Sequence, residues 1–349
     1  MSEQPITVDK ATLTGFAVSI FVAAGVDRTI AEPWADALVS ANLRGVDSHG
    51  VIRIPRYVEQ IANGEINPRP ALRVERADGA IALIECDRAP GPYAMMRAMD
   101  EAIARARTVH IGWCAARNIT HAGAIGYFAL KAAEAGMIGL AMNASNPMMA
   151  YHGSRTAAVS SNPLAIAVPA ANRRPYLLDM STAVVANGKV MDARDRNLTV
   201  PTGWGLDAEG RDTTDPHRIA TLLPFAGPKG AGLSFMIECL GSLLPGHPRI
   251  APALAGEKGG GSQNGVAIAI NIAAFRDLGG FGLDADHLGD AIAGLEPAEG
   301  FDRVMLPGER GDGVLAEREA AGIPIPKGTW ARLAATAQAL GVAPPERLK

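Results

Sequence analysis

The chain has 349 residues, of which 48% are hydrophobic and 20% charged, and its formal net charge is −3 at pH 7. These values are ordinary for a globular protein of two or three domains, and without a long basic run the chain lacks the electrostatic footprint of a nucleic-acid-binding protein. No run of about 18 apolar residues predicts a membrane span, and the opening MSEQPITVDK lacks the regions of a signal peptide. We therefore expect a cytoplasmic protein with no nucleic-acid or membrane partner.

The N-terminal part of the sequence predicts helices. Residues 9–25 and 29–45 carry helical periodicity, and both segments end at a glycine, the residue most often found just beyond a helix end. A short helix resumes at Ile54 and breaks at Asn63–Gly64. The polar stretch DSHGVIR, residues 47–53, therefore begins just past the end of a helix.

The middle of the chain alternates between helix and strand patterns. Residues 121–136 predict a helix that begins near Ala122, and residues 137–143 predict a strand. Two more strands are expected at 163–170 and 175–181, with only ANRRP between them. A parallel crossover needs about a dozen residues, so this pair is expected to be an antiparallel hairpin. The hairpin argues against a doubly wound sheet, and the dinucleotide fingerprint GxGxxG is also absent from the sequence.

The last third begins with a glycine-rich turn that leads into a helix, within residues 227–246, with Leu233, Ile237, Leu240 and Leu244 on one side. Residues 264–275 predict a buried strand, and the preceding loop at 257–265 is expected to be mobile. The C-terminal segment GTWARLAATAQALG predicts a final helix.

The glycine-rich centre suggests a separate central domain. We place it at residues 116–294 and expect the terminal pieces, residues 1–115 and 295–349, to pack together as a second unit.

The DSHGVIR stretch combines three groups that handle small anions. The Arg53 guanidinium can hold a carboxylate in a two-pronged hydrogen bond, and the Ser48 hydroxyl can donate one more. The His49 imidazole can donate to a carbonyl oxygen or carry a proton. The alternative interpretation is a solvated polar turn after a helix.

A second histidine, His121, stands immediately before a predicted helix. The partial positive charge of a helix N-terminus disfavours an imidazolium and lowers the histidine pKa, which gives the neutral imidazole that a general base needs. The alternative is a histidine that only caps the helix. Tyr127, six residues further on, is expected in the core.

Two other segments suit a nucleotide. Lys229 in PKGAG offers a cation beside open backbone N–H groups at a helix start, which suits a phosphate or pyrophosphate, although a plain glycine-rich turn is the alternative. Asp179 ends a strand and can accept hydrogen bonds from a ribose or an amide, or cap the next turn. The strand-end loops NASNP and SSNP, residues 143–147 and 160–163, are interpreted as turns.

The sequence lacks the patterns typical of disulfide frameworks, metal sites and nucleophilic serines. The cysteines, Cys86, Cys114 and Cys239, are far apart and odd in number, which indicates neither a disulfide framework nor a zinc knuckle. The seven histidines include no pair at the spacing of a metal-binding helix, and no GxSxG marks a nucleophilic serine. We therefore expect no metal.

Several motifs together resemble the malate/L-lactate dehydrogenase family, whose fold is not of the Rossmann type. They are GVDSHGVIRIPRYVEQI, THAGAIGYF, SSNPLAIAVPA, the segment from LDMST to DTTDP, LLPFAGPKGAGL and PGE at 307–309, and they span nearly the whole chain in order. The resemblance implies an α/β fold, a central cofactor domain built on a mixed or antiparallel sheet, helical terminal regions packed together, and a homodimer.

The resemblance also implies a role for each matching residue. His121 matches the family's base, and Ser48, His49 and Arg53 match its substrate-handling serine, histidine and arginine; Tyr57 is expected to join the substrate-binding set. The implied contacts to the nicotinamide cofactor, NAD or NADP, are Ser145, Asp179, Met180, Ser181, Lys229 and Gly230.

The implied activity is hydride transfer between NAD or NADP and a small 2-hydroxy acid, with ureidoglycolate, malate, lactate and sulfolactate as candidates. GAIGYF, GKVMDARDRN and GPKG are most similar to the ureidoglycolate dehydrogenase branch. Cyclic ketimine reductases, the alternative within the family, have an aspartate where this chain has Lys189. A nucleotide-binding scaffold and a metal hydrolase using His49 and His121 are alternatives from other classes. The arginines of ANRRPY suit either the 2′-phosphate of NADP or a solvated turn.

Overall fold

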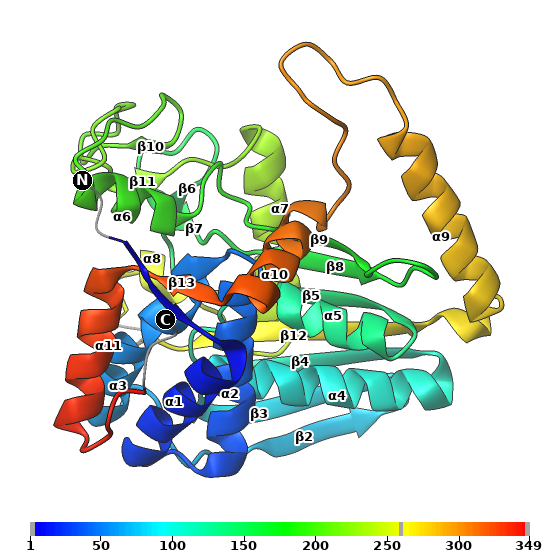
Figure 1. Ribbon diagram of the computed structural model, residues 1–349, viewed down its shortest axis with the longest axis horizontal. Coiled ribbons are helices and arrows are strands. Elements are labelled where there is room, and N and C mark those ends of the chain that lie inside the picture. Colours follow the sequence, from blue (N-terminus) through cyan, green and yellow to red (C-terminus); the bar gives the residue numbers. More distant parts are fainter. Residues whose placement is uncertain (1–3, 258–260, 346–349) are drawn as a thin grey trace.

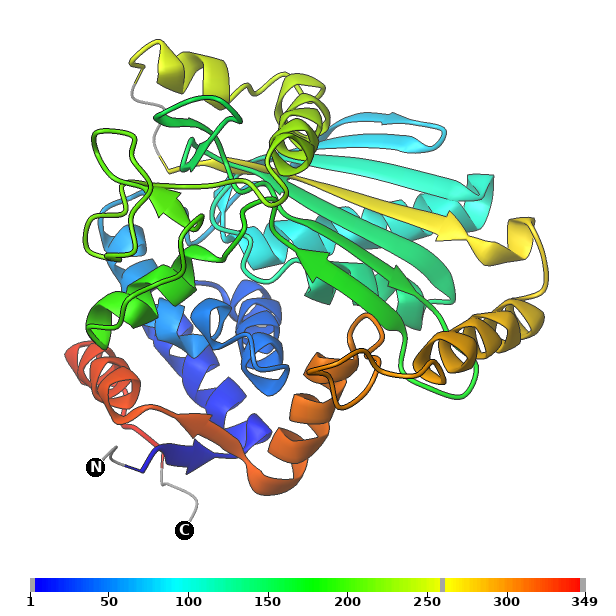
Figure 2. The ribbon, with the colours of Figure 1, turned by 90° about the horizontal axis from the view of Figure 1, so that it is seen from above.

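The computed structural model describes residues 4–257 and 261–345 and has two main hydrophobic cores (Figures 1 and 2). One core lies between a large sheet and its covering helices, and the other joins the two ends of the chain. No helix among the described residues is both long and apolar enough to cross a bilayer.

The two ends of the chain form one helical unit, as expected. Strand β1 (Ile6–Val8) pairs antiparallel with β13 (Ile323–Ile325), which brings the C-terminal helices against the N-terminal ones (Figure 2). Phe16 packs on Trp330 across this junction, with ring centroids 5.8 Å apart. The helices of this unit are α1 (Lys10–Ala23), α2 (Arg28–Leu43), α3 (Ile54–Ala62), α10 (Glu309–Ala321) and α11 (Lys327–Ala339).

The central sheet has seven strands in the order β2-β3-β4-β12-β5-β8-β9. Only β3 and β4 run parallel; every other neighbouring pair is antiparallel. The predicted hairpin is confirmed, because β8 pairs antiparallel with β9. The strands are β2 (Arg73–Asp78), β3 (Ile81–Ala89), β4 (Ile111–Ile119), β5 (Met137–Ala144), β8 (Leu164–Val168), β9 (Tyr176–Met180) and β12 (Gln263–Asn271).

Helices α4 (Gly91–Val109) and α5 (Gly126–Glu134) cover one face of this sheet (Figure 1). The interface is rich in alanine, so the helices lie close to the strands. A Cβ at Gly112 would collide with the backbone of α4, and one at Gly139 would collide with that of α5. Glycine at these two strand positions therefore permits the close helix–sheet packing.

The other face carries smaller elements. Helix α7 (Pro228–Glu238) continues into a π-helical segment, Cys239–Leu243. Of its predicted one-sided apolar residues, Ile237 is buried, whereas Leu240 and Leu244 are exposed. The remaining elements are α6 (Asn187–Asp195), α8 (Ile250–Leu254), α9 (Leu278–Ala293) and the small sheet β10-β11-β6-β7, formed by β6 (Met149–Ala150), β7 (Ala157–Val159), β10 (Gly205–Leu206) and β11 (Thr221–Leu222).

The structure differs from two of the sequence expectations, the domain division and the start of a helix. The division placed at residue 115 falls inside β4, and the sheet takes strands from both sides of it, because β2 and β3 pair with β4. The helix expected near Ala122 begins only at Gly126, since residues 121–125 are irregular. The loop expected to be mobile lies partly outside the described residues, at 258–260.

Candidate active site

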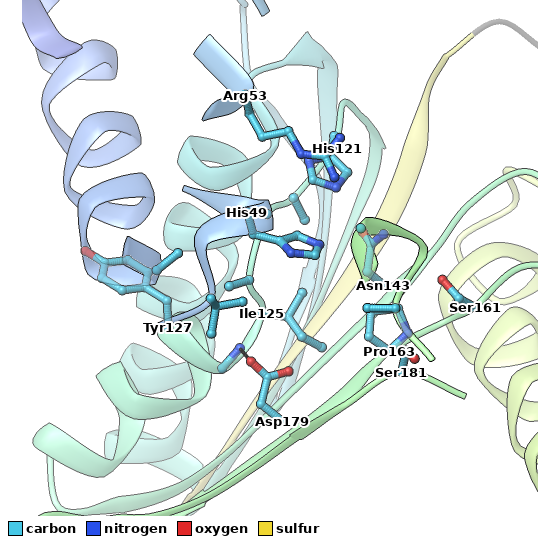
Figure 3. Close-up of a pocket in the computed structure, with 18 of the residues that line it drawn as sticks. His49, Arg53, His121, Ile125, Tyr127, Asn143, Ser161, Pro163, Asp179 and Ser181 are labelled. Carbon is cyan, nitrogen blue, oxygen red and sulfur yellow. Dashed lines mark hydrogen bonds between the residues drawn. The ribbon is translucent and has the colours of Figure 1, made fainter. Parts of the chain in front are cut away.

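A cavity of about 690 Å³ lies between the terminal helical unit and the end of the central sheet (Figure 3). It is lined by segments that are far apart in the sequence: the 47–53 stretch and α3, the loop before α5, the ends of β5 and β9, and the start of α10. Its volume lies within the range of about 300–1,000 Å³ that is usual for small-molecule and cofactor sites.

The DSHGVIR stretch forms two short 3-10 turns, Asp47–His49 and Val51–Arg53, directly after α2. Asn42 holds both turns, because its Oδ1 accepts from the Val51 N–H (2.8 Å) and its Nδ2 donates to Asp47 (2.6 Å). A Cβ at Gly50 would collide with the Asn42 amide, so this approach requires glycine. Arg318 of α10 pairs with Asp47 at 2.7 Å. Asp47 is therefore a structural residue that anchors the turns.

Ser48, His49 and Arg53 lie together, as the sequence predicted. The Ser48 hydroxyl is 2.9 Å from Nδ1 of His49, and Arg53 Nε donates to the Ser48 carbonyl oxygen at 2.6 Å. His49 and Arg53 line the cavity, and Ser48 lies against Gly188 just behind it. The solvated-turn interpretation does not fit, since all three residues are half-buried and His49 and Arg53 face a cavity.

His121 joins this group from the far end of β4. Its ring lies 5.5 Å from that of His49, centroid to centroid, at an interplanar angle of 22°. The Tyr57 hydroxyl is 2.7 Å from its Nδ1. Figure 3 shows Arg53, His49 and His121 close together on one side of the cavity. A Cβ at Gly91 would collide with the His121 carbonyl oxygen, so that glycine permits this placement.

Burial keeps both imidazoles neutral. It lowers the pKa of His49 to about 4, with a further contribution from the Arg53 charge. Burial also lowers the pKa of His121 well below its usual value, helped by His49, Arg53 and Arg56. The lowered pKa of His121 agrees with the sequence expectation, but its cause differs. Helix α5 begins five residues after His121, at Gly126, so burial and not a helix N-terminus lowers this pKa.

Asp179 lies at the opposite end of the cavity, where β9 ends (Figure 3). Its carboxylate accepts the backbone N–H of Gly126, the first residue of α5, at 3.0 Å. Burial among the cavity walls raises its pKa to about 6, although the side chain stays accessible to water inside the open cavity. Met180 and Ser181 follow it along the same wall.

Ser145 lies on this wall too, but the PKGAG residues do not. The Ser145 hydroxyl is 2.6 Å from that of Ser160, and its N–H donates to Asn162. Lys229 and Gly230 stand at the start of α7 and do not line the cavity. Lys229 is exposed, and a Cβ at Gly230 would lie 2.5 Å from a backbone oxygen, which is the close packing of a tight turn.

Sequence reasoning missed several cavity residues. Asn143 and Ser161 belong to the loops interpreted as turns, yet both line the cavity, opposite the histidines in Figure 3. Asn143 donates to Gln263 at 2.8 Å. Tyr127, expected in the core, also lines the cavity and donates its hydroxyl proton to Asp36. For Asn143 and Ser161, the signal was their place at a strand end and in a connecting loop, where binding residues are common.

Within residues 4–257 and 261–345, no group of three or more His, Cys, Asp or Glu side chains could hold a metal ion. The two stacked histidines have no acidic or thiol partner to complete such a site. A metal hydrolase built on His49 and His121 therefore has no support in the geometry.

Comparisons with known proteins cover nearly the whole chain. A sequence model described as malate/L-lactate dehydrogenase matches residues 8–334. Ureidoglycolate dehydrogenase (NAD(+)) of Escherichia coli O157:H7 is 36% identical over 301 residues, covering 85% of this chain and 86% of that protein.

Solved structures also superpose on nearly the whole chain. The malate dehydrogenase of Pyrococcus horikoshii OT3 superposes with a TM-score of 0.89 at 34% identity, covering 99% of this chain and 98% of that one. The delta1-piperideine-2-carboxylate reductase of Pseudomonas syringae pvar. tomato superposes with a TM-score of 0.85 at 28% identity, covering 95% and 99%.

Proposed function

The chain belongs to the malate/L-lactate dehydrogenase family, and from this premise we propose that it transfers a hydride between a nicotinamide cofactor and a small 2-hydroxy acid or the corresponding 2-oxo acid. The observation that carries the proposal is the convergence of Arg53 with the two neutral, stacked histidines His49 and His121 in one cavity. A carboxylate-binding cation beside neutral imidazoles is what the oxidation of a 2-hydroxy acid requires.

Each group has a distinct task. Arg53 holds the substrate carboxylate, and Ser48 helps by fixing the Arg53 and His49 side chains through its carbonyl and hydroxyl oxygens. His121 is the proton-transfer group: it takes the hydroxyl proton during oxidation and returns one during reduction. His49 orients the reacting oxygen.

The wall opposite the histidines suits a nicotinamide cofactor, which supplies or accepts the hydride when bound. Asp179 can accept hydrogen bonds from ribose hydroxyls, and Ser145 and Ser181 can donate to an amide or phosphate. Met180 offers an apolar surface to a ring. Lys229 and Gly230 lie outside the cavity lining, and we assign them to the cofactor only because exposed Lys229 at the start of α7 could pair with a pyrophosphate.

NAD is the preferred cofactor. The arginines of ANRRPY, which could have contacted the 2′-phosphate of NADP, are already paired: Arg173 with Asp286 and Asp290, and Arg174 with Glu319. The ureidoglycolate dehydrogenase relative is named for NAD(+).

An open-chain acid similar to ureidoglycolate, malate or lactate is the preferred substrate. Lys189, which stands where the cyclic ketimine reductases have an aspartate, is exposed and does not line the cavity. The chain therefore has no carboxylate at this position to complete the serine–histidine–aspartate set. Reduction of cyclic ketimine carboxylates with NADPH remains the second candidate, supported by the structural similarity to the piperideine-carboxylate reductase.

The proposal is tested by following nicotinamide absorbance with a panel of 2-hydroxy and 2-oxo acids, including ureidoglycolate, and one cyclic ketimine, each with NAD(H) and NADP(H). Turnover of an open-chain acid with NAD supports the proposal. Turnover of the ketimine alone transfers the assignment to the second candidate, and no turnover of any compound contradicts both.

We also propose that the protein is a homodimer in the cytoplasm. Large apolar side chains cluster on the outer face of α7 and its π-helical extension, where Phe235, Met236, Leu243 and Leu244 are exposed. Monomers rarely expose a continuous patch of this kind, and a second copy would cover it. The three cysteines are all free, which suits a reducing compartment. Sedimentation equilibrium tests the dimer: a monomeric wild-type protein contradicts it, and Met236→Glu with Leu244→Glu should dissociate it.

A further inference from the structure

Tyr57 has a single hydrogen-bond partner among the residues that the structure describes, and that partner is the histidine assigned to proton transfer. Its hydroxyl lies 2.7 Å from His121 Nδ1. Only 2% of the residue is exposed, and its ring packs against Trp34, 5.2 Å away between centroids. Tyr57 lies on the cavity lining but is almost inaccessible to solvent, and His121 Nδ1 is the one hydrogen-bond partner of its hydroxyl among the described residues.

From this contact we infer which nitrogen of His121 carries the proton. A buried phenol donates its hydrogen when it can, because a buried donor left without an acceptor is unfavourable. Nδ1 must then be the acceptor, and the single proton of the neutral ring lies on Nε2. Nε2 is the nitrogen left for the cavity, so the resting His121 presents an N–H group to the substrate oxygen.

A neutral ring in this form cannot act as an acid alone. Loss of the Nε2 proton would leave an imidazolate unless Nδ1 gained a proton in the same event. Tyr57 is the group placed to provide it. Burial raises the pKa of Tyr57, so the phenolate would be short-lived, while the nearby charges of Arg53 and Arg56 act in the opposite direction.

We propose that Tyr57 and His121 form a proton relay, in which the Tyr57 hydroxyl proton moves to Nδ1 as the Nε2 proton moves to the substrate oxygen. The relay rests on the proposed function. In reduction, C2 of the 2-oxo acid receives the hydride, the C=O π electrons become a lone pair on oxygen, and the O–H bond forms as the Nε2–H bond breaks. Nδ1–H forms as the Tyr57 O–H breaks.

The cycle consumes one solvent proton for each 2-oxo acid reduced. When the product leaves, a hydronium ion from bulk water transfers this proton to Nε2 and leaves as water, and the Nδ1 proton moves back to the Tyr57 phenolate. Oxidation runs the same steps in reverse, so it requires the Tyr57 phenolate and should accelerate with rising pH. Tyr57 was expected to bind substrate and lies on the cavity lining, and the relay gives it a role toward the histidine as well.

The first test needs no substrate. Two-bond ¹H–¹⁵N correlation spectra of the wild-type protein report the tautomer of each histidine, and the His121 signals are assigned by their loss in His121→Gln. We expect a protonated Nε2 and an unprotonated Nδ1. A proton on Nδ1 would overturn the relay while leaving the proposed function intact.

The second test separates a relay from mere orientation of the ring. We expect Tyr57→Phe to lower kcat for 2-oxo acid reduction about 100-fold, with KM changed less than about threefold. The matched control, Tyr93→Phe, removes the same atom from a tyrosine outside the cavity lining and should retain wild-type rates.

Reaction rates in mixtures of H₂O and D₂O report how many protons move in the rate-limiting step. A deuterated cofactor confirms that hydride transfer limits the rate. The relay predicts a curved dependence on deuterium fraction for wild type and a linear one for Tyr57→Phe. A linear dependence in wild type overturns it, even if Tyr57→Phe does not fold. Absence of turnover in wild type refutes the proposed function instead, and the tautomer still tests the contact.

Discussion

The two walls of the cavity are built differently. One wall carries His49 and Arg53 from the turns after α2 and His121 from the segment after β4, and each of these side chains is held by another residue of the protein. The wall from the central sheet carries one carboxylate, Asp179, together with hydroxyl groups and strand ends. The first wall is suited to moving a proton, and the second is suited to holding an extended polar ligand.

Burial acts on the two walls in opposite directions. It lowers the pKa of His49 and His121, which removes positive charge, and it raises the pKa of Asp179, which disfavours negative charge. The same desolvation therefore makes neutral bases on one side and a reluctant anion on the other. Mutations on the two walls should consequently affect different measurements.

The largest expected effect is on the histidine wall. We expect His121→Ala to lower kcat about 10²- to 10⁴-fold, since it removes the proton-transfer group, and to change KM little. His287→Ala, on exposed α9, is the control and should have normal kinetics. Steady-state rates with the substrate found in the panel provide the measurement. Near-normal turnover of His121→Ala would remove this residue from the mechanism.

The next effect concerns substrate binding. We expect Arg53→Lys to reduce kcat/KM about 10- to 100-fold, mainly through KM, because an ammonium cannot reproduce the two-pronged hydrogen bond to a carboxylate. The affinity for NAD, measured by titration calorimetry, should stay constant, since the cofactor is assigned to the other wall. Equal losses in substrate and cofactor binding would contradict the division of tasks between the walls.

The turns that support the histidine wall should be sensitive to volume. We expect Gly50→Ala to destabilise the protein by about 1–3 kcal/mol, because the new Cβ would displace Asn42 from the turns. Gly15→Ala is the matched control: nothing lies within 4 Å of a Cβ there, and alanine in a helix is favoured over glycine by about 1 kcal/mol. Urea unfolding should show opposite signs for the two variants.

The smallest effect is a pH dependence of opposite sign on the two walls. Asp179 has a folded-state pKa of about 6, above its usual 3.8, so its charge costs stability above pH 6, and this cost disappears as the pH falls toward 4. We expect Asp179→Asn to unfold at a higher temperature than wild type at pH 7.5, with the difference shrinking through this window. A difference in unfolding temperature between Asp179→Asn and wild type that does not vary with pH would contradict the raised pKa of Asp179 as its cause.

His49 should behave in the reverse way. Its folded-state pKa is about 4, below its usual 6.5, so its contribution to stability is present above pH 6.5 and is lost as the pH falls toward 4. We expect His49→Asn to lose less stability than wild type over this range. Thermal unfolding of both proteins in the same buffers provides the comparison.

The sequence could predict much of the fold because its signals are local. The helices ending before Gly25 and Gly45, the hairpin of β8 and β9 and the buried strand β12 follow from periodicity and connection length. The Ser48, His49 and Arg53 group could also be predicted, since one pair of turns holds all three. The position of Lys229 relative to the cavity could not be predicted in this way, because a glycine-rich helix start has the same sequence pattern whether it faces a cavity or the solvent.

What the sequence alone determined is therefore part of the element list, the family resemblance and the identity of the polar groups. Only the tertiary structure decided that Tyr57 meets His121 across 64 positions, that Asn143 lines the cavity, and that burial, not a helix end, keeps the histidines neutral. The physical reason is that periodicity reports which face of an element is buried, whereas desolvation and side-chain partners depend on which distant segments close over that face.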